Sequence, residues 1–166
     1  MTGAVATRVA DVAIRPSSGA GPVLLATFDV PFDKTATKFA VRAAVEASRT
    51  LIVANVVELP PLPYSIHMGW DMLDYTPEME ASLKAPVDLA LAQGLSVERL
   101  RVKSFRRVEA LVQVAREREV EMLVLGPDRR RVSERLYRKA AGAVRDRLDC
   151  LVWVSWELPT EKPPGG

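Results

Sequence analysis

The chain has 166 residues, of which 48% are hydrophobic and 27% charged, and its formal net charge is +2. This length fits one domain with a single core, and this composition excludes a disordered chain. The single cysteine, Cys150, excludes a disulfide framework. Charged residues interrupt the amino-terminal segment, so it has neither the pattern of a signal peptide nor that of a membrane span. We therefore expect a cytoplasmic protein without a membrane partner.

Basic residues are unevenly spread along the chain. Residues 126–149 carry eight Lys and Arg side chains against four Asp and Glu. A local excess of this size suits a small anion, whereas a nucleic acid requires a larger basic face. We therefore do not expect a nucleic-acid partner.

The first part of the chain contains two apolar runs separated by a helical pattern. Residues 1–21 are small, polar and aperiodic, and they are predicted to form a flexible arm. The run at 23–28 predicts a strand that is buried on both faces. Alanines at spacings of three and four then predict a helix over 34–48, and a second apolar run predicts a strand over 51–57.

A segment rich in proline and aromatic residues, 58–76, follows the second strand. A loop of this length is a candidate for covering a ligand or contacting a partner, and it holds the only histidine, His67.

The rest of the chain continues the alternation of helices and strands. Ser104 is a candidate N-cap for one helix, and the segment 158–166 is predicted to form a flexible tail. Apolar strands separated by helices long enough for crossovers predict a parallel sheet with helices on both faces, formed by residues 22–157. The predicted elements after the loop are a helix (77–94), a strand (97–103), a helix with Val108, Leu111, Val112 and Ala115 inside, a strand (122–126), a helix (132–148) and a strand (150–156).

The strand ends carry a set of motifs in a fixed order. The first strand ends in Thr27-Phe28-Asp29-Val30-Pro31, and the second in Ala54-Asn55-Val56-Val57-Glu58. The fourth reads Val120-Glu121-Met122-Leu123-Val124-Leu125-Gly126, and the last begins Cys150-Leu151-Val152-Trp153-Val154. With the alanine-rich helix, these segments resemble the universal stress protein family over residues 22–156. The resemblance implies a three-layer α/β sandwich with a five-stranded parallel sheet in the order 3-2-1-4-5.

One motif divides that family. Nucleotide-binding members carry Gly-x-x-Gly, nine residues and then Gly-(Ser/Thr) after the fourth strand, because glycines let backbone N–H groups approach the phosphates. Only the first glycine is present here, since the segment reads Gly126-Pro127-Asp128-Arg129-Arg130-Arg131. Arg129 replaces the second glycine, and Pro127 has no N–H to donate. The backbone cradle is lost, but three arginine side chains remain to hold a phosphate.

Asp29 follows the first strand, where sheets of this type bind ligands, and the resemblance places it beside a bound nucleoside. The implied cofactor is ATP or another adenine nucleotide, and no metal site is expected. The alternatives are a turn-forming aspartate and a solvated arginine loop. The candidate site for a nucleotide or another anion consists of Asp29, Gly126, Arg129, Arg130 and Arg131.

The resemblance also implies a homodimer that forms through the last strand. Large aromatic side chains on that strand fit an interface, although they fit packing against the domain's own helices equally well. The predicted dimer edge consists of Cys150, Val152, Trp153, Val154 and Trp156.

The sequence contains no Gly-x-Ser-x-Gly elbow, no phosphate-gripping Gly-Lys-(Ser/Thr) loop and no Cys/His metal cluster. The hypothesis that we favour is a non-catalytic, dimeric stress-response module that binds a nucleotide or other anion weakly and acts on a regulatory protein partner. The alternative is a slow ATP hydrolase that uses Asp29 and the arginine loop.

Overall fold

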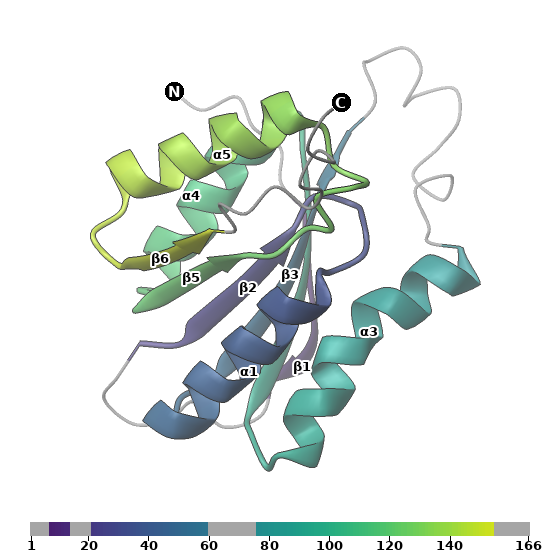
Figure 1. The fold of residues 1–166 in the computed structure, drawn as a ribbon, viewed down its shortest axis with the longest axis vertical. Helices are drawn as coiled ribbons and strands as arrows, with labels where there is room; N and C mark the ends of the chain where they lie inside the picture. The colour runs from purple at the N-terminus through teal and green to yellow at the C-terminus, as the bar shows by residue number, and fades with distance from the viewer. Residues whose placement is uncertain (1–6, 14–20, 60–75, 155–166) are drawn as a thin grey trace, which may run out of the picture.

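The computed structural model describes the backbone of residues 7–13 and the whole of residues 21–59 and 76–154. These residues form one sheet with helices on both faces (Figure 1). Five strands are mutually parallel, which confirms the predicted sheet and its order 3-2-1-4-5. Across the sheet the strands are β1 (Thr7–Ala13), β4 (Val97–Ser104), β3 (Leu51–Glu58), β2 (Val23–Thr27), β5 (Met122–Leu125) and β6 (Leu151–Val154).

The sixth strand, β1, lies where the sequence predicts a flexible arm. It runs antiparallel to β4, with Thr7 opposite Lys103 and Ala13 opposite Glu98. Arg8 and Asp11 break the alternation that identifies a strand in a sequence, so the pattern gives no signal here. By pairing with β4, β1 satisfies backbone groups that an edge strand would leave open.

Within the described residues, two helices cover each face of the sheet (Figure 1). α1 (Lys34–Ala47) and α3 (Pro77–Ala92) lie on one face, and α4 (Arg107–Glu117) and α5 (Glu134–Arg147) lie on the other. None of these helices is long and apolar enough to cross a membrane.

Side-chain caps fix where three of the helices begin. Asp33, Thr76 and Ser133 each accept a hydrogen bond from the backbone N–H three residues later. The prediction of Ser104 as the N-cap of α4 is wrong, because the N-cap is Arg106. The Ser104 hydroxyl instead accepts the Arg106 N–H at 3.0 Å and donates to the Arg106 carbonyl at 3.1 Å, which delays the helix by two residues.

The core has two parts, one on each side of the sheet. β2 and all but the last residue of β3 are buried on both faces, as their unbroken apolar runs predict. The predicted inner stripe of α4 is fully buried, and α5 buries Tyr137 in preference to Leu136. Full burial of a Val or Leu side chain, such as Leu111, stabilises the fold by about 1.5–3 kcal/mol. The two layers hold the carboxyl ends of the parallel strands at one edge of the sheet.

Candidate ligand-binding site

The order of the strands brings the two halves of the predicted site together. β2 lies between β3 and β5, so the chain leaves β2 toward one side and later returns on the other. In parallel sheets a crevice opens at the carboxyl ends of the strands where the order reverses in this way. Asp29 follows β2 and Gly126 follows β5, so both stand at this crevice.

The turn after β2 is held by a side chain from the neighbouring strand. Asp29 has a φ of 57°, a left-handed conformation that aspartate and asparagine adopt more readily than most residues. Its N–H donates to Asn55 Oδ1 at 2.6 Å, and Asn55 Nδ2 donates to Asp29 Oδ1 at 3.5 Å. Asn55 is almost fully buried in β3, whereas Asp29 is exposed at the rim. Asn55 therefore fixes the direction in which Asp29 faces the crevice.

The surroundings of Asp29 change the pKa of its carboxyl group. Loss of hydration around the carboxyl raises its pKa, against the opposing effects of the Asn55 hydrogen bond and of the charges on Arg101 and Arg107. The carboxyl thus lies in a partly dehydrated position that two guanidinium groups reach electrostatically.

Three residues that interact with Asp29 were not predicted from the sequence: Asn55 through hydrogen bonds, and Arg101 and Arg107 through their charge. The sequence contains two indications of these residues. Asn55 is the one polar residue inside the apolar run of β3, and Arg101 is one of the polar residues that alternate with apolar ones along β4.

The loop after β5 is fastened to the loop after β2. Phe32 and Pro127 form an isolated antiparallel bridge. The Asp33 N–H donates to the Gly126 carbonyl at 2.9 Å, and the Asp128 N–H donates to the Pro31 carbonyl at 2.8 Å. The two loops therefore form one rigid rim along the crevice.

Most backbone N–H groups of the β5 loop are already bonded within the chain. The Gly126 N–H donates to the Ala26 carbonyl, and the Arg130 N–H donates to the Asp128 carboxylate at 3.0 Å. The N–H groups of Arg131 and Val132 both donate to the Asp128 carbonyl, at 2.9 and 3.1 Å. Since proline has no N–H, the loop offers little of the backbone cradle that binds phosphates elsewhere.

Gly126 has a packing role in this rim. A Cβ atom at this position would lie 2.7 Å from Leu25 Cδ1 and 3.2 Å from Ala36 Cβ. A side chain here would force Leu25 to shift, so glycine is favoured where the chain leaves β5 and passes against β2 and α1.

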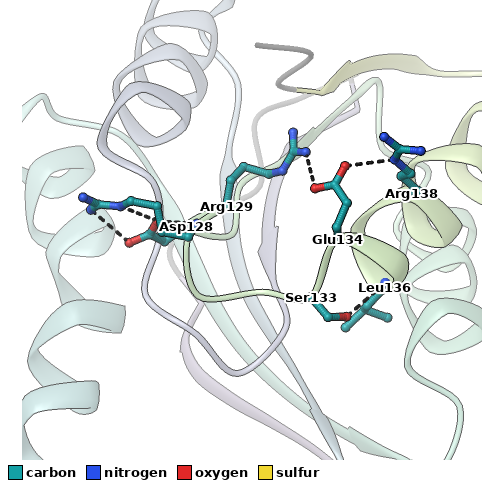
Figure 2. A network of polar contacts seen from close by, with 7 residues as sticks. Asp128, Arg129, Ser133, Glu134, Leu136 and Arg138 are labelled. Atoms are coloured by element: carbon teal, nitrogen blue, oxygen red, sulfur yellow. Dashed lines mark hydrogen bonds and ion pairs between the residues drawn. The ribbon is translucent and has the colours of Figure 1, made fainter. Parts of the chain in front are cut away.

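The side chain of the arginine that replaces the second motif glycine reaches Glu134 at the start of α5 (Figure 2). The Arg129 side chain is only 7% exposed, and its guanidinium carbon lies 3.8 Å from the centre of the Tyr137 ring. Its Nη2 donates to Glu134 Oε1 at 2.6 Å, and the other oxygen of Glu134 accepts from Arg138 at 2.9 Å. These hydrogen bonds lower the pKa of Glu134, so this carboxylate stays charged beside Arg129.

The other two arginines of the loop are exposed. Arg130 folds back on Asp128, and its Nε lies 3.3 Å from Asp128 Oδ1. Burial would raise the pKa of Asp128, but the hydrogen bonds and charge of Arg130, with the charge of Arg131, lower it overall. The three arginines therefore occupy three different environments, and two of them are neutralised by carboxylates of the same segment.

At the opposite edge of the sheet from β1, β6 pairs with β5 and with no other described strand. Leu151 is 68% exposed, while Val154 is buried. Trp153 stacks on Phe39 of α1, with ring centroids 5.2 Å apart, so this tryptophan packs against its own domain. Burial raises the pKa of the half-buried Cys150 thiol, which keeps it protonated at neutral pH. Trp156 lies outside the described residues, as do His67 and most of the predicted covering loop.

Residues 20–155 match the model of the universal stress protein family. A solved universal stress protein in complex with cAMP has 22% identity and a TM-score of 0.54, over 82% of this chain and 98% of that one. One from Archaeoglobus fulgidus has 16% identity and a TM-score of 0.57, over 81% and 92%. The A. fulgidus protein in complex with dAMP has 17% identity and a TM-score of 0.53, over 81% and 96%. No curated protein sequence matches the chain.

Proposed function

Because the chain belongs to the universal stress protein family, we propose that it is a non-catalytic, dimeric stress-response module of the cytoplasm that weakly binds an adenine nucleotide. The nucleotide would occupy the crevice at the carboxyl ends of β2 and β5, beside Asp29. Bound and free forms would then differ in how they engage a regulatory partner.

This proposal rests on the hydrogen bonds and ion pairs within the loop after β5. Its backbone N–H groups are bonded within the chain, and Arg129 is folded onto Tyr137 and Glu134. A nucleotide phosphate at this loop would lack the backbone N–H donors that a glycine-rich loop supplies, which argues for weak binding. Charge stabilisers at a reacting phosphate are also lost, which argues against catalysis.

The support for an adenine nucleotide is of two kinds. Relatives with the same fold bind cAMP and dAMP. Asn55 holds Asp29 at the crevice, where its partly dehydrated carboxyl would accept a hydrogen bond from a ribose hydroxyl.

We expect AMP, cAMP or ATP at ten times its dissociation constant to stabilise the fold by about 1.4 kcal/mol. In a chain of this size that gain raises Tm by roughly 3–6 °C, which a thermal-shift titration detects. Asp29→Ala should abolish the shift, because it removes the carboxyl at the crevice.

Asp88→Ala is the matched control, since Asp88 is an exposed aspartate on α3. It should keep the shift. A shift that is equal in all three proteins would place the nucleotide elsewhere, and the absence of a shift with every nucleotide would contradict nucleotide binding.

The alternative of a slow ATP hydrolase rests on the raised pKa of Asp29, which makes its carboxylate a better proton acceptor. That mechanism also needs arginine side chains at the transferred phosphate, and the Arg129 guanidinium is already held by Glu134 and the Tyr137 ring. Turnover of radiolabelled ATP that disappears in both Asp29→Ala and Arg129→Ala would favour the hydrolase over the binding module.

A further inference from the structure

A second concave surface lies at the carboxyl end of the sheet, on the face covered by α4 and α5. It has a volume of about 290 Å³ and opens between the end of β3, the first turn of α4 and the first half of α5. We call it the α4/α5 pocket. Its apolar wall includes Val108, which belongs to the core, and Leu136, which packs against it.

Three cationic side chains line this pocket: Arg106 and Arg107 from the start of α4, and Lys139 from α5. Two carboxylates, Glu58 and Glu109, also line it. Glu58 lies 3.6 Å from Arg107, a loose ion pair whose carboxylate is more than half exposed. Cations therefore outnumber anions here.

Arg106 and Lys139 differ from the arginines of the β5 loop. Both are exposed, and neither has an ion-pair partner within the described part of the chain. In the β5 loop, by contrast, Arg129 and Arg130 are held by Glu134 and Asp128. An incoming anion would have to break those ion pairs, whereas Arg106 and Lys139 form no such pair with another described residue.

The α4/α5 pocket is also electrostatically linked to the crevice. Arg107, which lines the pocket, is one of the two guanidinium groups whose charge acts on the Asp29 carboxyl. The pocket and Asp29 also adjoin the carboxyl end of the same strand, β3, because Glu58 lines the pocket and Asn55 binds Asp29. One ligand would therefore place its sugar at Asp29 and its phosphate at the pocket.

We propose that the α4/α5 pocket binds the phosphate group of the ligand through Arg106, Arg107 and Lys139, in place of the loop after β5. The identity of the ligand as a nucleotide rests on the proposed function. Guanidinium groups bind phosphate oxygens in pairs, and an ammonium group adds a point charge, so this set suits a phosphate dianion.

The test is isothermal titration of the full chain with AMP and, separately, with pyrophosphate. Two double variants are compared, Arg106→Gln with Lys139→Gln and Arg130→Gln with Arg131→Gln. Each removes two exposed positive charges near the carboxyl end of the sheet. Loss of charged hydrogen bonds at the pocket should weaken both probes by roughly tenfold or more, and the loop variant should change them by about twofold or less. Circular dichroism checks that both variants are folded.

The outcomes separate the pocket from the proposed function. AMP binding that is lost in the loop variant but kept in the pocket variant would overturn the pocket and leave the nucleotide module intact. Pyrophosphate binding that depends on Arg106 and Lys139, without any AMP binding, would support the pocket and contradict the nucleotide. Failure of both probes to bind the unchanged chain would overturn both.

Discussion

Asp29 carries an energetic cost that its position at the crevice explains. The Asp29 carboxyl has a higher pKa in the folded chain than in the unfolded chain, so its ionisation destabilises the fold at pH values above the folded-state pKa. This loss of stability decreases as the pH falls through the folded-state pKa, and it is absent below the unfolded-state pKa of about 3.9. Since the loss of hydration outweighs the favourable effects of Asn55, Arg101 and Arg107 on this charge, the residue is better suited to a ligand than to stability.

Asp29→Asn should therefore be more stable than the unchanged chain at pH 7. Asparagine tolerates the same left-handed backbone and removes the dehydrated charge. The difference in Tm between the two proteins should shrink as the pH is lowered from 7 to 4. A difference that stays constant over this range would show that the charge is not its cause.

Gly126 belongs to the phosphate-binding motif of the family, but in this chain it also packs closely against Leu25 and Ala36. Gly126→Ala should destabilise the fold by about 1–3 kcal/mol, because the added Cβ overlaps a fully buried leucine beneath the loop. Chemical unfolding measures the change.

Gly142→Ala is the matched control for this substitution. A Cβ atom there meets nothing within 4 Å, and the residue is inside α5, so alanine should stabilise the helix by about 0.5–1 kcal/mol. If both variants had the same stability, the packing role of Gly126 would be refuted.

Among the elements, the short strand β6 is the one predicted to join two copies of the chain. Two residues of the predicted dimer edge are used within the domain, because Val154 faces the core and Trp153 stacks on α1. The most exposed large apolar side chain of the strand is Leu151, which was not among the predicted residues. If the dimer forms through β6, Leu151→Arg should shift it toward monomers, because a charge would be buried in the interface. Light scattering after gel filtration measures the mass.

Leu89→Arg on α3 is a suitable control, since Leu89 is also an exposed leucine but lies on a helix. It should leave the mass unchanged. A monomeric unchanged chain, or a dimer that is indifferent to Leu151→Arg, would contradict dimerisation through β6.

Sequence patterns predicted the regular elements well because the physical signals are local. The N-cap side chains and apolar runs lie within a few residues of the boundaries that they set, so α1 was expected at 34–48 and is observed at Lys34–Ala47. The start of α4 was missed because the Ser104 hydroxyl bonds both the N–H and the carbonyl of Arg106. β1 was missed because its partner, β4, lies some ninety residues away and only the pairing identifies it.

At the scale of the whole molecule, the site was only half predictable. A parallel sheet places Asp29 beside the loop after β5 whatever the side chains do, so this pairing follows from the fold class. The position of the Arg129 guanidinium depends on which face of α5 carries Tyr137 and Glu134, and the charge of Arg107 acts on Asp29 from the first turn of α4. Such interactions join elements that are distant in the chain, and no pattern within one segment contains them.

The rim that joins the two loops also has a kinetic consequence. Many enzymes and switches trap a ligand by closing a loop over it, and the opening of that loop then limits release. Here the loop after β5 is held to the loop after β2 by the Phe32–Pro127 bridge and by backbone bonds on both sides of it. A segment fixed at both ends cannot swing over a bound molecule. Movement of the loop after β5 would therefore not limit how fast a ligand leaves this rim, and any slow step in release would have to come from another part of the chain.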